Sequence, residues 1–176
     1  MLNALDDSKL EILKLSNPRI GLFTASAGSP RNLYHNIDRM IKSGVSRCSP
    51  YGMVSSISGT LTFNLTSIFK IKGSSCCFVS ACASSGHAIG YAYDLIKKGL
   101  QDIIIVTSGE DGDFSTIVPF AGMRALSNNL NINLASKPFD SKRDGFVGSG
   151  GGVTIILEEL NHALNRNSTV YGEIAG

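Results

Sequence analysis

Short apolar runs alternate along the chain with stretches of helical periodicity, and this pattern predicts an α/β fold. The runs expected to form strands are rich in aliphatic residues and bounded by turn residues: residues 19–24, 76–79, 102–107 and 153–157, with a last strand beginning at 170–174. The run at 102–107 is almost continuously aliphatic, which is typical of a parallel strand covered on both faces. Helices are expected at residues 34–42, 116–126 and 158–165 and in the stretch ending near Gly99. A strand, a helix and a strand at this spacing predict a right-handed crossover unit.

Residues 76–99 are the most informative stretch of the chain, because they predict a strand, a tight turn and a helix in succession. The apolar run at its start has the length of a buried strand, and the small residues at 80–85 permit a tight turn. The next apolar positions follow helical spacing, and Gly99 is a typical helix stop. This pattern places Cys82 immediately before the N-terminus of a helix.

A cysteine at that position has a favourable environment for nucleophilic chemistry. The thiolate is the attacking species, and the unpaired N–H groups and the positive dipole end of a helix N-terminus stabilise it. The same N–H groups can bind an oxyanion, and small neighbours leave room for a carbonyl group to approach the sulfur. The competing interpretation is an ordinary buried thiol, because free cysteine is among the most buried residue types. Cys82 is therefore predicted as a candidate nucleophile, and burial of its thiol would argue against that role.

Residues 137–152 combine a charged segment with consecutive glycines. Such glycines indicate a backbone that adopts positive φ or passes close to another part of the chain. A phosphate-binding loop is not favoured, because the sequence lacks the lysine of a Walker-type loop and no helix start follows. We expect instead that the glycines let this loop pass close beneath the cysteine site.

Composition and charge narrow the class of protein. With 176 residues, 43% hydrophobic and 17% charged, the chain is expected to fold as one globular domain. The net charge of +2 gives no bulk electrostatic case for binding nucleic acid or a membrane. The four cysteines show no CxxC pairing, so no metal site is expected, and reduced thiols fit a cytoplasmic setting. The N-terminal segment has the pattern of neither a secretory signal nor a transmembrane span, which also favours a cytoplasmic location.

Three separate blocks of the chain resemble a known enzyme family. The blocks are SACASSGHAIGYAYDLIKKGLQDIII, FAGMRALS and KPFDSKRDGFVGSGGGVTIILEEL. They resemble the beta-ketoacyl-[acyl-carrier-protein] synthases, which are the condensing enzymes of fatty-acid elongation. Within that family the resemblance is greatest to synthase I. The likeness runs from about Asn17 to the C-terminus. It implies a thiolase-like layered sandwich, of which residues 1–176 would be a single partial domain: the N-terminal half of a duplicated fold, without its first strand and without its C-terminal half. It also favours a helix at residues 53–69, where β-branched residues leave the pattern ambiguous.

The resemblance implies a 3-oxoacyl-[acyl-carrier-protein] synthase activity. Cys82 would take an acyl group from the phosphopantetheine thioester of acyl carrier protein, and the acyl-enzyme would condense with the carbanion equivalent left when malonyl carrier protein loses carbon dioxide. Phe120 matches a phenylalanine that borders the acyl pocket, with core packing as the alternative. Lys42 and Arg47 lie in a segment that would face the acidic carrier protein, with a solvated loop as the alternative. No cofactor is implied beyond the phosphopantetheine that carries the substrates.

The family assigns decarboxylation to two histidines and a lysine in its C-terminal half. The histidines present, His35, His87 and His162, do not match that pair, and His87 is expected to be structural because its position on the predicted helix turns it away from Cys82. This chain is therefore expected to carry the nucleophile without condensing alone. An inactive remnant, or a module for carrier-protein binding or dimerisation, is the alternative function, and a thiol hydrolase on an unrelated fold is the least favoured.

The family's assembly also implies partners for the chain. The family dimerises through the strand before the nucleophile, which corresponds here to residues 76–81. Half of a duplicated fold would expose apolar surface, and large exposed apolar patches favour association. We therefore expect a homodimer or pairing with a complementary C-terminal fragment.

Overall fold

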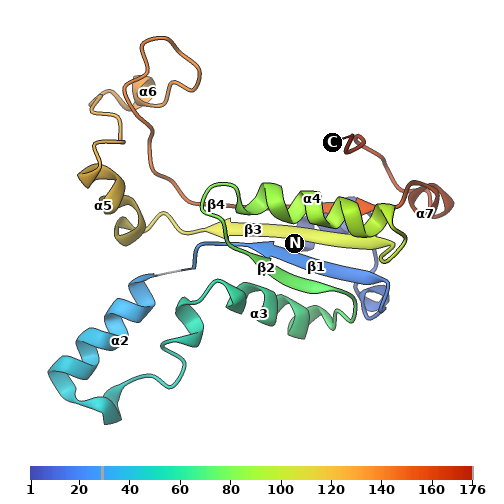
Figure 1. Cartoon of the computed structure of the whole chain (residues 1–176), viewed down its shortest axis with the longest axis horizontal. Helices are drawn as coiled ribbons and strands as arrows, with labels where there is room; N and C mark the ends of the chain where they lie inside the picture. The colour runs from blue at the N-terminus through green and yellow to red at the C-terminus, as the bar shows by residue number, and fades with distance from the viewer. Residues whose placement is uncertain (29, 176) are drawn as a thin grey trace. The chain divides into compact units, whose positions relative to one another are not determined.

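The computed structural model describes residues 1–28 and 30–175, which form two compact units (Figure 1). The first unit consists of residues 1–28, 57–109 and 152–175, and the second consists of residues 30–56 and 110–151. The first unit contains the sheet and the turn that carries Cys82, whereas the second consists mainly of helices and loops.

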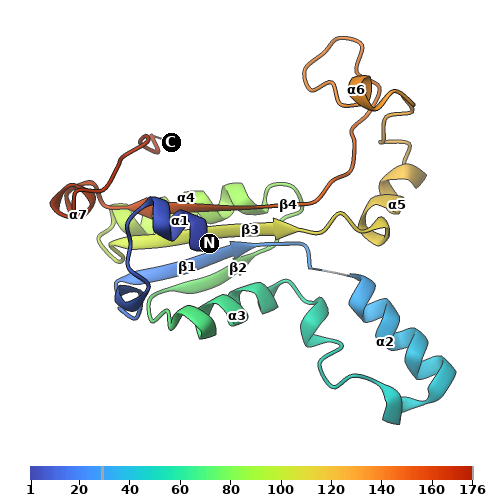
Figure 2. The same cartoon turned by 180° about the vertical axis from the view of Figure 1, so that it is seen from behind.

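A four-stranded sheet in the order β2-β1-β3-β4 forms the centre of the first unit. Its strands are β1 (Ile20–Ala25), β2 (Ser75–Phe78), β3 (Ile103–Glu110) and β4 (Gly151–Glu158). β1 pairs in parallel with both β2 and β3, and Phe23 lies opposite Cys76. β4 runs antiparallel to β3, with the hydroxyl oxygens of Thr107 and Thr154 2.9 Å apart (Figure 2). The sheet order makes β2 and β4 the edge strands.

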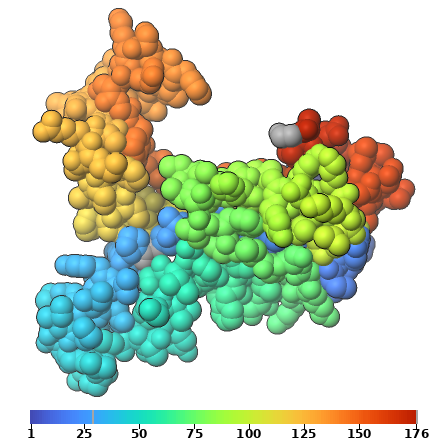
Figure 3. All heavy atoms as spheres, in the orientation of Figure 1, coloured from blue at the N-terminus to red at the C-terminus, as the bar shows by residue number. Residues whose placement is uncertain are grey.

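One face of the sheet is covered by α4 (Ser84–Lys97). Ala88 and Ala92 of this helix are fully buried and pack with Phe23, Ile104 and Val106 in one core cluster. Small helix residues at these positions let the helix lie close to the strands. Figure 3 shows that the segment from β2 through α4, coloured green to yellow-green, forms the surface of the first unit on this face.

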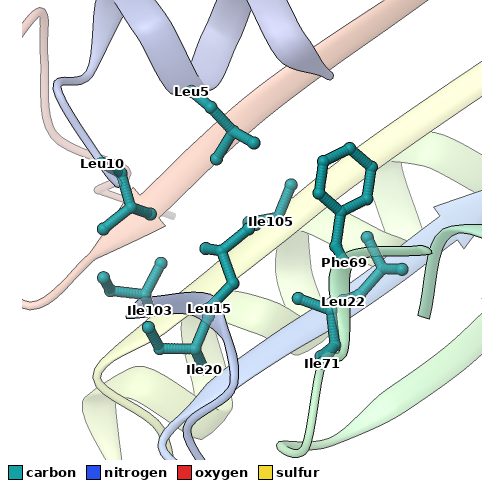
Figure 4. Close-up of a cluster of buried hydrophobic side chains, with 9 residues drawn as sticks. All are labelled: Leu5, Leu10, Leu15, Ile20, Leu22, Phe69, Ile71, Ile103 and Ile105. Carbon is teal, nitrogen blue, oxygen red and sulfur yellow. The ribbon is translucent and has the colours of Figure 1, made fainter. Parts of the chain in front are cut away.

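The opposite face is covered by α1 (Leu2–Asp7), the 3-10 turn Ile12–Leu15 and α3 (Gly59–Phe69) (Figure 2). The core cluster on this side contains Leu5, Leu10, Leu15, Ile20, Leu22, Phe69, Ile71, Ile103 and Ile105 (Figure 4). Alternate residues of β3 therefore enter the two cores. Burial on both faces explains why the β3 sequence is aliphatic at successive positions.

Charged groups join the C-terminal end of β4 to the N-terminal segment. Arg166 follows α7 (Leu160–Asn165) and donates to both carboxylate oxygens of Glu158, at 2.7 and 2.6 Å. It also donates to the carbonyl oxygen of Ser8, at 2.6 Å. Burial opposes ionisation of Glu158, but the hydrogen bonds from Arg166 and His162 outweigh it, so the pKa of this carboxyl lies below its ordinary value.

The second unit contains three helices and two 3-10 turns: α2 (Pro30–Ser43), α5 (Phe114–Gly122), α6 (Ile132–Ala135), Val45–Arg47 and Val54–Ser56. Arg31 of α2 forms an ion pair with Asp113, whose carboxylate also caps α5 by accepting from the N–H of Ser115. The glycine loop passes close to another backbone segment, since a Cβ on Gly150 would lie 2.6 Å from the backbone nitrogen of Gly112. The nearest atoms to Gly150 thus belong to residues 110–112, and passage beneath the cysteine site stays a prediction.

The α/β class and most of the predicted elements are confirmed, although several elements differ in their bounds. The strand predicted at 170–174 is wrong, because these residues form no strand and Tyr171 instead bonds its hydroxyl to Asp7. The helix predicted at 53–69 begins only at Gly59, after a separate 3-10 turn. The helix predicted at 116–126 is shifted to Phe114–Gly122, because the Asp113 cap starts it earlier.

Candidate active site

Cys82 lies in the turn that joins β2 to α4 in the first unit. β2 ends at Phe78, and α4 begins at Ser84 with Ala83 as its N-cap residue. Cys82 therefore lies immediately before a helix N-terminus, as the sequence pattern predicted. Its thiol is free and its side chain is exposed, so the interpretation of an ordinary buried thiol is wrong.

The backbone of this turn adopts an unusual conformation just before the cysteine. Ala81 has φ +48°, in the left-handed region that alanine rarely adopts. A non-glycine residue in this region costs about 1–2 kcal/mol, and it persists only where surrounding contacts hold it. The turn is thus a strained segment, and Cys82 is the next residue along it.

Ser84 supplies the contacts that hold the turn. Its hydroxyl accepts a hydrogen bond from the N–H of Ser80 and donates one to the carbonyl oxygen of Ala81, each 2.7 Å long. The Ser84 N–H reaches the same carbonyl at 3.2 Å, and the Ala83 N–H donates to the Ser80 carbonyl at 3.0 Å. Ser84 is only 6% exposed, so water competes little for these bonds.

The other three cysteines have different surroundings. Cys76 is exposed in the edge strand β2, and Cys77 beside it is half-buried. Cys48 belongs to the second unit, where it is half-buried and its Sγ lies 3.7 Å from the carbonyl oxygen of Asn36. Cys82 is the one cysteine of the four that combines an exposed thiol with a position before an α-helix.

An open hollow of about 520 Å³ lies along α4 and the residues that follow β2. It is lined by Phe78, Val79, Ser80, Gly86, His87, Gly90, Tyr91 and Asp94. His87 is exposed on this surface and not packed into the core, although its N–H continues the helix by donating to the Ala83 carbonyl. Phe78 and Tyr91 also contact the buried ring of Phe23, at centroid distances of 5.3 and 5.6 Å.

Phe120, the predicted pocket residue, belongs to α5 in the second unit. Its ring makes an edge-to-face contact with Phe146, with the ring centroids 5.2 Å apart. Both rings remain partly exposed, so Phe120 is not a core residue within this unit. Cys82 belongs to the first unit, so a shared acyl pocket stays a prediction.

Lys42 and Arg47, the predicted carrier-protein contacts, also belong to the second unit. Lys42 is in the last turn of α2, and Arg47 ends the following 3-10 turn. Both are exposed, in agreement with either a docking surface or a solvated loop. A hydrogen bond to Asp38 raises the pKa of Lys42, so this ammonium stays charged at neutral pH although its charge is partly neutralised.

Ser84 is the functional candidate that the sequence interpretation did not single out. From the sequence, its small size indicates only that an incoming carbonyl group has room to approach the sulfur. A serine in the first turn of a helix often bonds to nearby backbone. That tendency was the available signal, but it does not reveal that the bonds reach back across Cys82 to Ala81 and Ser80.

The described residues contain neither a metal-binding cluster nor a membrane-spanning helix. Within residues 1–28 and 30–175, no group of three or more His, Cys, Asp or Glu side chains is arranged to hold a metal ion. The same part of the chain contains no helix with the length and apolarity needed to cross a membrane.

A model for the beta-ketoacyl synthase N-terminal domain matches residues 1–163. Two similar curated proteins are both named 3-oxoacyl-[acyl-carrier-protein] synthase 1. The protein from Buchnera aphidicola subsp. Schizaphis graminum is 40% identical over 100% of this chain and 44% of its own length. The protein from Escherichia coli K12 is 39% identical over 92% of this chain and 41% of its own length. The chain thus spans less than half the length of these relatives.

Solved structures give the same result for the fold. A beta-ketoacyl synthase from Burkholderia phymatum superimposes with a TM-score of 0.80 and 30% identity, over 94% of this chain and 43% of that one. A ketosynthase solved in complex with a type II PKS acyl-carrier protein has a TM-score of 0.77 at 22% identity, over 94% of this chain and 46% of that one. The layered sheet described above therefore corresponds to about half of a ketosynthase fold.

Proposed function

The chain belongs to the beta-ketoacyl synthase family, as its sequence blocks predicted, and on that premise we propose that Cys82 is an acyl-accepting nucleophile. The observation that carries the proposal is the exposed thiol held by a strained turn at the start of α4. The substrate would be an acyl group on the phosphopantetheine of acyl carrier protein.

The acyl transfer forms a carbon–sulfur bond to Cys82 and breaks the carbon–sulfur bond to phosphopantetheine. The Cys82 thiolate attacks the thioester carbonyl, and the positive end of α4 favours the negative charge on sulfur. Collapse of the tetrahedral intermediate forms the Cys82 thioester and breaks the carbon–sulfur bond to phosphopantetheine, whose thiolate then takes up a proton. Covalent catalysis of this kind divides one difficult step into two easier ones.

Condensation requires further groups. In the complete protein, the acyl group on Cys82 would be attacked by the carbanion equivalent formed from malonyl carrier protein. The histidines of this chain are not expected to supply the decarboxylating pair: His35 is in α2, His162 is hydrogen-bonded to Glu158, and His87 lies along the outer surface of α4. We therefore expect acyl transfer without condensation from the chain alone.

The carrier protein is the proposed macromolecular partner, in the cytoplasm. Lys42 and Arg47 provide exposed positive charge, and one structural neighbour was solved with its acyl-carrier protein. An acidic partner would be attracted by these charges, and the attraction would weaken as salt screens it. No resident cofactor is proposed.

Acylation of Cys82 is the direct test of this function. The chain is mixed with acyl carrier protein that bears a labelled acyl group, and the label on the chain is measured by intact-mass spectrometry. We expect the wild-type chain and Cys76→Ser to be labelled, and Cys82→Ser to lose at least about 100-fold in labelling rate because a hydroxyl is a far weaker nucleophile than a thiolate. Equal labelling of Cys82→Ser would show that the assignment is wrong.

A module for dimerisation is the second candidate function, favoured by the position of β2. This strand is at the edge of the sheet, where one side of its backbone has no neighbouring strand among the described residues, and Val79 directly after it is 60% exposed. We expect dimers in sedimentation velocity and weaker association for Val79→Asp. Leu13→Asp, at a site that is 91% exposed in the 3-10 turn Ile12–Leu15, is the control and should leave association unchanged. A wild-type chain that sediments as a monomer would argue against this module.

A further inference from the structure

We propose that Ser84 is the positioning residue that holds Cys82 in its reactive placement. The serine hydroxyl itself, and not the N-terminal end of α4 as a whole, makes the contacts on which this role depends. Its bearing on catalysis rests on the proposed role of Cys82, but the positioning can be measured without any acyl carrier protein.

The Ser84 hydroxyl bridges the Val79–Ser80 peptide group and the Ala81–Cys82 peptide group, which enclose Ser80 and Ala81. It accepts from the Ser80 N–H on one side and donates to the Ala81 carbonyl on the other, both at 2.7 Å. The Ala81 carbonyl belongs to the peptide plane that continues into the Cys82 nitrogen. Fixing that carbonyl therefore fixes the orientation of the peptide that carries the nucleophile.

The strain and burial around Ala81 give these bonds their importance. A residue at φ +48° returns to the extended or helical region unless something holds it. The hydroxyl of Ser84 is shielded from water, and removing a buried hydrogen-bonding partner leaves the Ser80 N–H unpaired. Without the hydroxyl, Ala81 would relax from its strained positive φ. The Cys82 thiol would then move away from its position at the start of α4.

The experiment compares Ser84→Ala with Ser84→Thr, which keeps the hydroxyl, and with Ser85→Ala, which removes the neighbouring hydroxyl. The readout is the rate of iodoacetamide alkylation at neutral pH, resolved for each cysteine by peptide mass spectrometry. The exposed thiol of Cys76 serves as an internal reference in every sample.

We expect Ser84→Ala to slow alkylation of Cys82 about threefold to fivefold, the size of a helix-terminus effect on a thiolate, with Cys76 unchanged. Ser84→Thr should restore the rate, and Ser85→Ala should leave it unchanged. An unaltered Cys82 rate in Ser84→Ala, or equal slowing of Cys76 and Cys82, would overturn the proposal.

A second measurement applies even if Ser84→Ala folds poorly. In the wild-type chain, the Ser80 amide should exchange slowly with deuterium because it donates to a buried hydroxyl, and fast exchange there would overturn the proposal. These readouts separate two failures. Loss of acylation with intact positioning would reject the function alone, whereas acylation with no effect of Ser84 on alkylation would reject the positioning role alone.

Discussion

At the scale of single residues, the site depends on the backbone conformation of the turn before Cys82, and the amino-acid composition of that turn does not predict this conformation. Small residues at 80–85 correctly predicted a tight turn, and the exposed thiol agrees with the prediction of an accessible nucleophile. The residue in the left-handed conformation is Ala81, although glycine is the residue usually expected at positive φ. The hydroxyl that stabilises it was also not predictable, because several serines in the segment have the same local pattern.

Substitutions at Ala81 test the strain directly. This side chain is exposed, so changes in stability will report backbone conformation more than packing. We expect Ala81→Val to lower the free energy of unfolding by about 1–2 kcal/mol, because a β-branched residue is strongly disfavoured at positive φ. Ala81→Gly should stay within about 1 kcal/mol of wild type, since relief of strain offsets the larger entropy of the unfolded chain. Urea denaturation measures both, and a fully stable Ala81→Val would contradict the strained turn.

At the scale of elements, sequence rules worked where local chemistry decides the structure. α4 ends at Lys97, and Gly99 just beyond it, with φ +68°, is the stop that the sequence predicted. The Gly99 N–H donates to the Ile96 carbonyl and the Leu100 N–H to the Leu95 carbonyl, the pattern of a Schellman cap. The rules failed for residues 170–174, where an apolar segment has strand-like composition but no strand partner in the sheet. Pairing is a property of the whole sheet, so the run alone could not predict it.

The end of α3 offers a prediction at this scale. Lys70 is its C-cap, with φ +55° and ψ +35°, and its N–H donates to Thr66. Lys70→Gly should raise the free energy of unfolding by about 0.5–1 kcal/mol, because glycine adopts this conformation without the penalty on Cβ. Lys72→Gly, an exposed position outside the left-handed region, should lower it instead. Destabilisation by Lys70→Gly in urea titrations would contradict the expectation.

At the scale of the whole molecule, the sequence predicted the class of fold and the half-length match, since the resemblance extends along most of the chain. It did not predict the hydrogen-bonded cluster of Glu158, His162 and Arg166, which joins β4 and α7 to the segment after α1. Arg166 and Ser8 lie at opposite ends of the sequence, so no local pattern could connect them.

This cluster predicts a dependence of stability on acid. Because the folded-state pKa of Glu158 lies below its ordinary value of 4.5, its contribution is present above that pH and is lost as the pH falls through the folded-state pKa. Asp102 adds a change of the same sign, since its hydrogen bond from Arg19 also lowers its pKa. Urea denaturation from pH 7 to pH 3 should show falling stability. Glu158→Gln should be less stable by about 2 kcal/mol at pH 7 and should show a shallower fall. An unchanged profile in Glu158→Gln would contradict the assignment.

The central place of β1 in the sheet determines when this protein can fold as it is made. A ribosome releases β1 long before either neighbouring strand, because β2 begins at Ser75 and β3 at Ile103. The apolar side chains of Leu22 and Phe23 therefore remain without their β3 partners until residues 103–110 have been synthesised. Such a nascent chain exposes apolar surface that favours aggregation until β3 has emerged and paired with β1.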